Sequence, residues 1–179
     1  MPGGLRYERD FITPDEEAAL VAQIGRLPLQ EARYKAYTAK RRIAVFGSAY
    51  DFETYELGPA PPLPGFLEPL RNRVSELVDA APGDFPHCLI NEYRPGTPLG
   101  WHRDVPEFEL VVGVSLAGHC RMRFRAYPPR KGAKIFVLDL EPRSVYVLRD
   151  EIRWRWQHSV APTRELRYSI TFRTARQPR

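Results

Sequence analysis

The chain has 179 residues, 43% of them hydrophobic, which is enough for one domain with a real core and too few for two full ones. Its net charge is +5, carried by 23 arginines and 4 lysines against 22 acidic residues. This balance allows a phosphate-rich partner such as nucleic acid, but it equally fits a plain basic surface. No apolar run approaches a membrane span, no signal peptide is recognisable, and only Cys88 and Cys120 are present. We therefore expect a soluble cytoplasmic protein with no membrane contact and with both cysteines reduced.

Two helices are predicted in the first part of the chain. A Thr-Pro-Asp-Glu capping box that begins at Thr13, with proline at the first helical position, predicts a helix from Pro14 to about Arg26. A second helix is predicted over Gly65 to Ala80, because its apolar residues recur at helical spacing. The proline-rich stretch 59–64 before it indicates a stiff connector.

Between these helices, residues 33–47 interleave basic and aromatic side chains. Such a makeup is expected of a segment that grips phosphates and stacks on a flipped base. A solvated, irregular edge loop is the simpler alternative. The composition of this segment does not decide between the two.

After Pro86 the pattern changes to short strands separated by Pro/Gly turns. Many short strands of this kind suggest a sandwich or jelly roll, so we expect a mainly β fold whose two N-terminal helices buttress one sheet. We treat residues 1–179 as a single domain, with a helical and lid region over about 1–84 and a β core over about 85–175. The predicted strands are His87–Tyr93, Leu110–Ala117, Arg121–Ala126, Lys134–Leu140, Ser144–Leu148 and Arg167–Thr174.

The tripeptide His102-Arg103-Asp104 is a candidate metal-binding motif. If this stretch is extended, residues two apart point to the same side, so His102 and Asp104 can face one metal ion. His158, close to the last strand, could complete a triad. Two histidines and one carboxylate occupy one face of an octahedral Fe(II) and leave three positions for a chelating cosubstrate and dioxygen. A closed zinc site would require four ligands, usually with thiolate among them.

Two other motifs compete with this interpretation. His-Arg-Asp is also the catalytic-loop tripeptide of protein kinases, but that loop needs Asn at the fifth position after Asp, where this chain has Glu109. The adjacent pairs His87-Cys88 and His119-Cys120 resemble a paired zinc motif. Because neighbours on a strand point to opposite faces, we expect core cysteines beside incidental histidines instead.

The last predicted strand has one polar and one apolar face. Its polar residues alternate with apolar ones, in the order Arg167, Tyr168, Ser169, Ile170, Thr171, Phe172 and Arg173. Two guanidinium groups on one face would be costly to bury without an anionic guest. A dicarboxylate is such a guest, because the planar fork of arginine pairs bidentately with carboxylate.

Together these motifs resemble the AlkB-like branch of the 2-oxoglutarate and Fe(II)-dependent dioxygenases, from about Arg41 to Arg173. The family signature is Asn-x-Tyr, His-x-Asp, a distal His, and Arg-x-Asn-x-Thr-x-Arg. The chain matches it with Asn91-Glu92-Tyr93, His102-Arg103-Asp104, His158 and the stretch from Arg167 to Arg173. Ser169 departs from it, since many members have Asn at this place.

The resemblance implies a double-stranded β-helix, or jelly roll, that binds Fe(II), 2-oxoglutarate and O2. The implied iron ligands are His102, Asp104 and His158. The residues implied to hold 2-oxoglutarate are Asn91, Tyr93, Arg167, Ser169, Thr171 and Arg173.

The resemblance also implies a reaction and a substrate region. Oxidative decarboxylation of 2-oxoglutarate would drive hydroxylation of a methyl carbon on a base nitrogen of DNA or RNA, which then leaves as formaldehyde. Residues 33–47 resemble the substrate lid of such enzymes, where Arg-Arg runs into Phe-Gly and then tyrosine. The candidate substrate residues are Arg41, Arg42, Phe46, Tyr50, Trp101 and Trp156. Both tryptophans could instead pack beside the ligands and keep the pocket dry.

Three hypotheses about function follow. The first is an oxygenase that dealkylates bases of DNA or RNA, in repair or in the modification of transfer RNA. The second is the same iron chemistry on a protein side chain or a small molecule. The third is a non-catalytic jelly-roll binding module, against which the intact triad and arginines argue.

Overall fold

Two antiparallel sheets form the body of the molecule, and the computed structural model describes residues 2–34, 37–54 and 56–176. The strands of the larger sheet are β1 (Leu5–Glu8), β2 (Gln30–Tyr34), β3 (Tyr37–Asp51), β4 (Glu56–Pro59), β5 (His87–Tyr93), β7 (Phe108–Leu116), β10 (Val145–Leu148) and β12 (Arg167–Ala175). Those of the smaller sheet are β6 (Leu99–His102), β8 (Cys120–Ala126), β9 (Phe136–Leu140) and β11 (Trp156–Val160). The predicted mainly β class is thereby confirmed.

The order of the strands brings distant parts of the chain together. The larger sheet runs β1-β10-β7-β12-β5-β3-β2, with β4 paired to β3, and the smaller one runs β6-β11-β8-β9. Because β12 lies between β7 and β5, the last strand of the chain is hydrogen-bonded on both edges. Side chains from both sheets line one cavity between them, which is where the candidate site lies.

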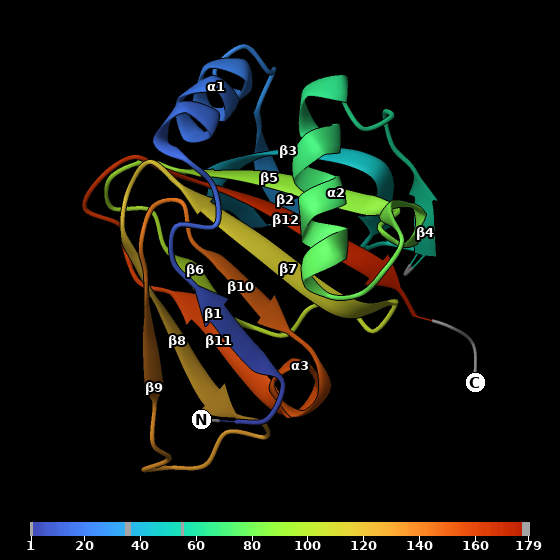
Figure 1. Cartoon of the computed structure of the whole chain (residues 1–179). Helices are drawn as coiled ribbons and strands as arrows, with labels where there is room; N and C mark the ends of the chain where they lie inside the picture. Colours follow the sequence, from blue (N-terminus) through green and yellow to red (C-terminus); the bar gives the residue numbers. More distant parts are fainter. Residues whose placement is uncertain (1, 35–36, 55, 177–179) are drawn as a thin grey trace.

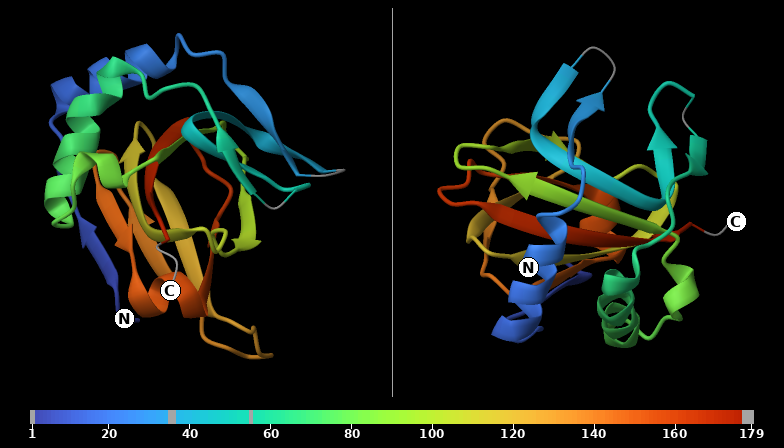
Figure 2. Two further views of the ribbon diagram at one scale, coloured as in Figure 1. Left: turned by 90° about the vertical axis from the view of Figure 1, so that its right-hand side faces the viewer. Right: turned by 90° about the horizontal axis from the view of Figure 1, so that it is seen from above.

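Two helices cover the outer face of the larger sheet, as expected (Figures 1 and 2). Helix α1 (Pro14–Ile24) begins at the predicted capping box, in which the Glu16 N–H donates to Thr13 Oγ1 and the Thr13 N–H donates to the Glu16 carboxylate. Helix α2 (Glu68–Leu77) follows the 3-10 turn η1 (Gly65–Leu67), and a second such turn, η2 (Pro82–Asp84), precedes β5. The apolar faces of both helices pack on the sheet in one hydrophobic core.

The two faces of β12 explain how this core and the cavity share one strand. Tyr168, Ile170 and Phe172 belong to the core beneath the helices. The alternate residues turn to the other face and line the cavity. Burying a side chain such as Phe172, which is fully enclosed, stabilises the fold by roughly 2–3 kcal/mol.

The segment 33–47 is not an irregular loop, because most of it belongs to β2 and β3. Gln30 pairs with Ile43 at one end, and β3 then pairs with β5 from Arg42 to Gly47. Lys35 and Ala36 of this segment lie outside the described residues. The segment forms a strand rather than a loop because its side chains alternate between two buried faces. Ile43 lines the cavity, and Ala44 packs against the core beneath the helices.

The run before His158 is not one continuous strand. Its first part forms a short helix, α3 (Asp150–Arg155), and β11 begins only at Trp156. Acidic residues occupy the first turn of α3 and basic ones its last turn, an arrangement that the helix dipole favours. Trp154 therefore does not share a strand face with His158, and its indole N–H donates to Glu109 Oε1 over 3.1 Å. No helix in the described ranges is both long and apolar enough to cross a membrane.

Candidate metal and cosubstrate site

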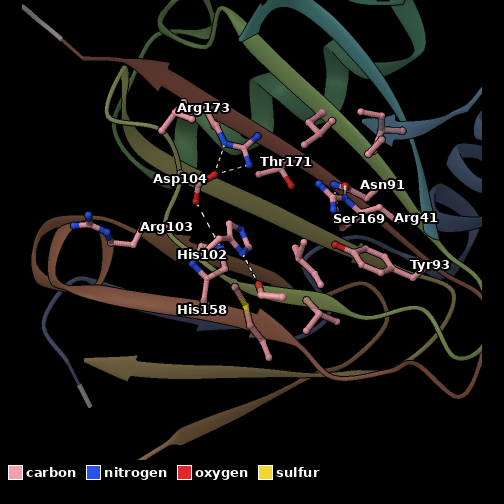
Figure 3. A pocket seen from close by; sticks show the side chains of 18 of the residues that line it. Arg41, Asn91, Tyr93, His102, Arg103, Asp104, His158, Ser169, Thr171 and Arg173 are labelled. Atoms are coloured by element: carbon pink, nitrogen blue, oxygen red, sulfur yellow. Dashed lines mark hydrogen bonds and ion pairs between the residues drawn. The ribbon is translucent and has the colours of Figure 1, made fainter. Parts of the chain in front are cut away.

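His102, Asp104 and His158 meet at one end of the cavity (Figure 3). β6 and β11 are neighbours, and their register places His102 directly opposite His158, with ring centroids 4.2 Å apart. Asp104 follows two residues after the end of β6. One donor atom from each residue lies within 4.8 Å of the other two, so the three side chains could hold one metal ion.

Both histidines are in the form that binds metals. Nδ1 of His102 lies 2.9 Å from the Gly100 carbonyl oxygen, which can only accept, so the proton is on Nδ1 and Nε2 keeps its lone pair. Burial lowers the pKa of His158 to about 3, helped by His102 and opposed by Asp104. Burial also lowers the pKa of His102, although Asp104 opposes it. Both rings are therefore neutral near pH 7.

Asp104 supplies the negative charge of the site. Burial by itself raises the pKa of this carboxyl, but the charge of Arg173 outweighs it, joined at low pH by the charges of the two protonated histidines, and the pKa is held well below its usual range. Oδ1 accepts from Arg173 Nε at 2.8 Å and lies 2.7 Å from its Nη2. Oδ2 is buried, 3.7 Å from His158 Nε2, and has no hydrogen-bond partner among the described residues. A cation would satisfy this oxygen, and two imidazoles with one carboxylate suit Fe(II).

Two buried arginines along β12 fit an anionic guest. Nε of Arg167 donates to Ser115 Oγ over 2.9 Å, and its guanidinium lies 5.0 Å from the centre of the Tyr93 ring. Nη1 of Arg167 and Nη1 of Arg173 are both buried without a hydrogen-bond partner within the described ranges. Unpaired buried donors of this kind are costly, and carboxylate oxygens would satisfy them.

The remaining predicted cosubstrate residues lie beside these arginines. Asn91 Nδ2 donates to Ser169 Oγ over 3.4 Å, and Arg41 Nε donates to Asn91 Oδ1 over 3.0 Å. Figure 3 shows Arg41, Asn91 and Ser169 grouped at some distance from the histidines. The six residues expected to hold 2-oxoglutarate all line the same cavity of about 740 Å³, namely Asn91, Tyr93, Arg167, Ser169, Thr171 and Arg173.

The predicted substrate residues divide into two groups. Arg41, Tyr50 and Trp101 line the cavity. Arg42 points to the opposite face of β3, where Nε and Nη2 each donate to the Glu92 carboxylate over 2.8 Å. Phe46 also leaves the cavity, because it packs against the core beneath the helices. Strand alternation thus turns Arg42 and Phe46, both predicted substrate residues, away from the cavity.

Trp156, the remaining predicted substrate residue, does not line the cavity either. Its side chain packs against the cluster inside the smaller sheet, and its indole N–H donates to Glu151 Oε1 over 3.3 Å. The cause is α3, which turns the chain just before Trp156 and brings Glu151 within reach of it. This tryptophan therefore has the packing role that the sequence offered as an alternative.

Phe52 and His87 are among the cavity residues that sequence reasoning did not assign to the site. Phe52 lies edge-on to Tyr50, with ring centroids 4.9 Å apart, and it is 36% exposed, so this end of the cavity opens to solvent. His87 lines the cavity while its neighbour Cys88 is buried in the core, which confirms that the two do not chelate together. The spacing of Tyr50 and Phe52 was a readable signal, because two aromatic residues two apart at the end of a strand can lie on the same side of it.

Arg153 is a further missed residue, and it holds the loop that carries Asp104. Its Nη2 donates to the carbonyl oxygens of Val105 and Phe108 over 2.7 and 2.6 Å, and Nη1 reaches the Asp104 carbonyl over 3.4 Å. The side chain is 3% exposed. Arg153 is thus a positioning residue, because it fixes the backbone on which a metal ligand stands.

Replacing Arg153 with methionine is expected to raise the Kd for Mn(II), used as a stable substitute for Fe(II), by about tenfold or more. Without the guanidinium, three carbonyl oxygens lose a donor and the loop carrying Asp104 loosens. Titration calorimetry measures the Kd without turnover. Arg155→Met, an exposed change on the same helix, is the control. Equal affinities in both variants would remove Arg153 from this role.

His87 is expected to contribute to acid sensitivity. Burial lowers its pKa from 6.5 to about 3, and Nδ1 lies 2.6 Å from the Ser48 carbonyl oxygen. Below pH 6.5 the unfolded chain takes up a proton that the folded chain refuses, so this stability is present above pH 6.5 and is lost as the pH falls toward 3.

His87→Gln should therefore show a smaller loss of urea midpoint between pH 7 and pH 5 than the wild-type chain. His119→Gln, at a side chain 43% exposed, is the matched control. Parallel pH profiles for wild type and His87→Gln would contradict the assignment. The comparison isolates His87, because His102 and His158 are present in every variant.

Several known proteins are similar to this chain in sequence. The model of the 2OG-Fe(II) oxygenase superfamily matches residues 4–173. The uncharacterised protein L905 of Acanthamoeba polyphaga mimivirus is 30% identical over 190 residues, which cover 95% of this chain and 84% of that protein. The alkylated DNA repair protein ALKBH8 homolog of Arabidopsis thaliana is 29% identical over 180 residues. That match covers 88% of this chain and only 50% of the Arabidopsis protein.

A solved structure shares the fold. The structure of OsALKBH1 superposes with a TM-score of 0.70 at 18% identity, and the match covers 97% of both chains. The arrangement of the two sheets is therefore the jelly roll expected from the sequence. The chain belongs to the 2OG-Fe(II) oxygenase superfamily, is similar to AlkB homologues within it, and is an oxidoreductase that uses Fe(II), 2-oxoglutarate and dioxygen.

Proposed function

We propose that this chain oxidatively removes alkyl groups from the bases of DNA or RNA. The observation that carries the proposal is the cavity, which extends from His102, Asp104 and His158 to the aromatic pair Tyr50 and Phe52. Its volume of about 740 Å³ leaves room for a flat base beside a small dicarboxylate, since pockets for small molecules span roughly 300–1,000 Å³. Aromatic rings at the open end suit stacking on such a base.

The net charge and a sequence relative support the same proposal. The net charge of +5 favours a polyanionic partner. One relative, from Arabidopsis thaliana, is named as an alkylated DNA repair protein. Because the chain spans half of that relative, the activity of the whole relative is not transferred, and the nucleic-acid substrate stays part of the proposal.

The proposal assigns a role to each end of the cavity. His102, Asp104 and His158 would hold Fe(II), which together with 2-oxoglutarate and dioxygen supplies the oxidation of an alkyl carbon on a base nitrogen. Arg173 lies at this end, because it is hydrogen-bonded to Asp104. Arg167 stands six residues along the same strand and would neutralise the distal carboxylate of 2-oxoglutarate.

The chain's own contribution is positioning and exclusion of water. Arg173 fixes one oxygen of Asp104 and so orients the other toward His158. The Gly100 carbonyl fixes the tautomer of His102. Apolar side chains, among them Leu89, complete the cavity wall and limit the water around the reacting groups. A hydroxylated N-methyl group collapses without further catalysis to formaldehyde and the free base nitrogen.

A turnover assay tests the proposal. Purified chain with Fe(II), ascorbate and 2-oxoglutarate should form succinate, and methylated single-stranded DNA or RNA should raise the rate and yield formaldehyde. The same oligonucleotides without methyl groups are the matched control. If succinate forms at an unchanged rate across the methylated panel, the substrate lies outside alkylated nucleic acid and the proposal fails.

A further inference from the structure

Three arginines project from the outer face of the smaller sheet. Arg121, Arg123 and Arg125 alternate along β8 with Met122 and Phe124, which are buried inside. Arg121 is balanced by Asp139, whose carboxylate lies 3.7 Å away. Across the described residues no carboxylate pairs with Arg123 or Arg125, so the positive charges of these two are not balanced by an acidic partner.

Cross-strand contacts hold the two unbalanced arginines in place. Arg123 Nε donates to Ser159 Oγ over 3.1 Å, and Arg125 Nε donates to Gln157 Oε1 over 2.8 Å. Both acceptors are neutral, and both are the direct register partners on β11. Each arginine is thus fixed through Nε, while its charge is left for another ligand.

Trp101 joins these arginines to the catalytic cavity. The guanidinium carbons of Arg125 and Arg123 lie 4.4 and 5.2 Å from the centre of its ring. Trp101 directly precedes His102, and both Trp101 and Arg123 also line the cavity. We call Trp101, Arg123 and Arg125 the arginine platform. It therefore begins at the rim of the cavity that contains the candidate metal ligands.

Trp101, Arg123 and Arg125 are each partly exposed. Helices α1 and α2 cover the other sheet, away from β8 and β9 (Figure 2). Next to the platform, the exposed Arg103 stacks over the Tyr127 ring at 3.9 Å, and Figure 3 shows it pointing away from the metal ligands. Planar cations beside exposed aromatic rings suit a chain of phosphates and unpaired bases.

We propose that the arginine platform binds the phosphodiester backbone of a single strand beside the nucleotide whose base enters the cavity. The inference rests on the proposed function for its substrate. A strand that places one base beside His102 must pass the cavity rim, where Trp101 and Arg123 lie. Stacking on Trp101 and ion pairs to Arg123 and Arg125 would then hold the flanking nucleotides without reading their sequence.

Strand binding tests the platform without requiring turnover. The full chain is titrated into fluorescein-labelled oligothymidylate and oligouridylate, and anisotropy gives the Kd at several salt concentrations. The double variant Arg123→Gln with Arg125→Gln should bind on the order of tenfold more weakly at low salt. The slope of log K against log salt should become shallower by about 1.4, for two lost phosphate contacts. Arg26→Gln, an exposed charge beyond the end of α1, should change neither value.

A conservative variant separates binding from bracing of the sheet. Arg123→Lys with Arg125→Lys keeps both charges but loses the Nε contacts to Ser159 and Gln157, so the salt slope should return to the wild-type value. If the lysine variant is as weak as the glutamine variant, or if the glutamine variant binds like wild type, the platform only braces the sheet and the inference is overturned.

The two proposals can fail separately. Loss of strand binding in the glutamine variant, with no alkylated base oxidised by the wild-type chain, would retain the platform and reject the dealkylation. If the wild-type chain oxidises a methylated trinucleotide but replacing Arg123 and Arg125 leaves strand binding unchanged, the dealkylation is retained and the platform is rejected. Absence of salt-dependent strand binding in the wild-type chain overturns the platform, while the trinucleotide assay still decides the dealkylation.

Discussion

Asp104→Ala is expected to abolish the formation of succinate from 2-oxoglutarate. The change removes the carboxylate from the candidate metal ligands and leaves the buried Arg173 without its partner. The Kd for Mn(II) should rise by more than the roughly 10–100-fold seen when a residue beyond the ligands is lost. Succinate assays and titration calorimetry measure the two effects independently.

A lost fold could imitate this result, because breaking a buried ion pair costs about 3–5 kcal/mol. Asp104→Asn keeps the size of the side chain and one carbonyl oxygen, and circular dichroism reports whether each variant folds. Asp139→Ala removes a carboxylate that is 57% exposed and should leave metal binding unchanged. A folded Asp104→Ala variant with wild-type turnover would refute the metal assignment.

Arg167→Lys is expected to raise the KM for 2-oxoglutarate by about 10–100-fold, with a smaller effect on kcat. Lysine keeps the charge but loses the planar fork, and charge-assisted hydrogen bonds are worth about 1.5–3 kcal/mol each. The Nε contact to Ser115 is lost as well, so the remaining cation is less well oriented. Succinate formation over a range of 2-oxoglutarate concentrations gives both constants.

Arg42→Lys is the matched control for this prediction. Its guanidinium makes a bidentate pair with Glu92 on the face of β3 turned away from the cavity. The KM for 2-oxoglutarate should therefore stay at the wild-type value. If Arg167→Lys leaves the KM unchanged, or if both variants raise it equally, Arg167 does not hold the cosubstrate.

The elements with a strong local signal were predictable from the sequence. The capping box at Thr13 fixed the start of α1, and the alternation from Arg167 to Arg173 fixed both faces of β12. His158 could be proposed as the third ligand, but its place directly opposite His102 could not be predicted, because that contact depends on the order β6-β11 in the sheet. Nothing local in the chain specifies which strands become neighbours. The treatment of residues 1–179 as one domain stays a prediction.

The errors came from competing local signals. Basic and aromatic residues in 33–47 pointed to a loop, and their mixture hid the alternation that makes β3 a strand. From the sequence no helix is predicted before His158, whereas the chain forms α3 there, with charges suited to the helix dipole. Arg153 could not be singled out, since its role depends on carbonyl oxygens of Val105 and Phe108 that lie 45 or more residues away.

The pairing of β3 with β5 has a consequence for how substrates enter. Residues from Arg42 to Gly47 pair with β5 from Glu92 back to His87, so this part of the lid is a continuation of the sheet that carries Asn91. This part of β3 cannot move away without breaking its backbone hydrogen bonds to β5, the strand that carries Asn91. Whether a substrate enters past this wall therefore depends on how well its shape fits the side chains of β3, and not on opening of the wall. Changes in substrate preference are expected to arise from side-chain replacements along β3 more than from altered hinges.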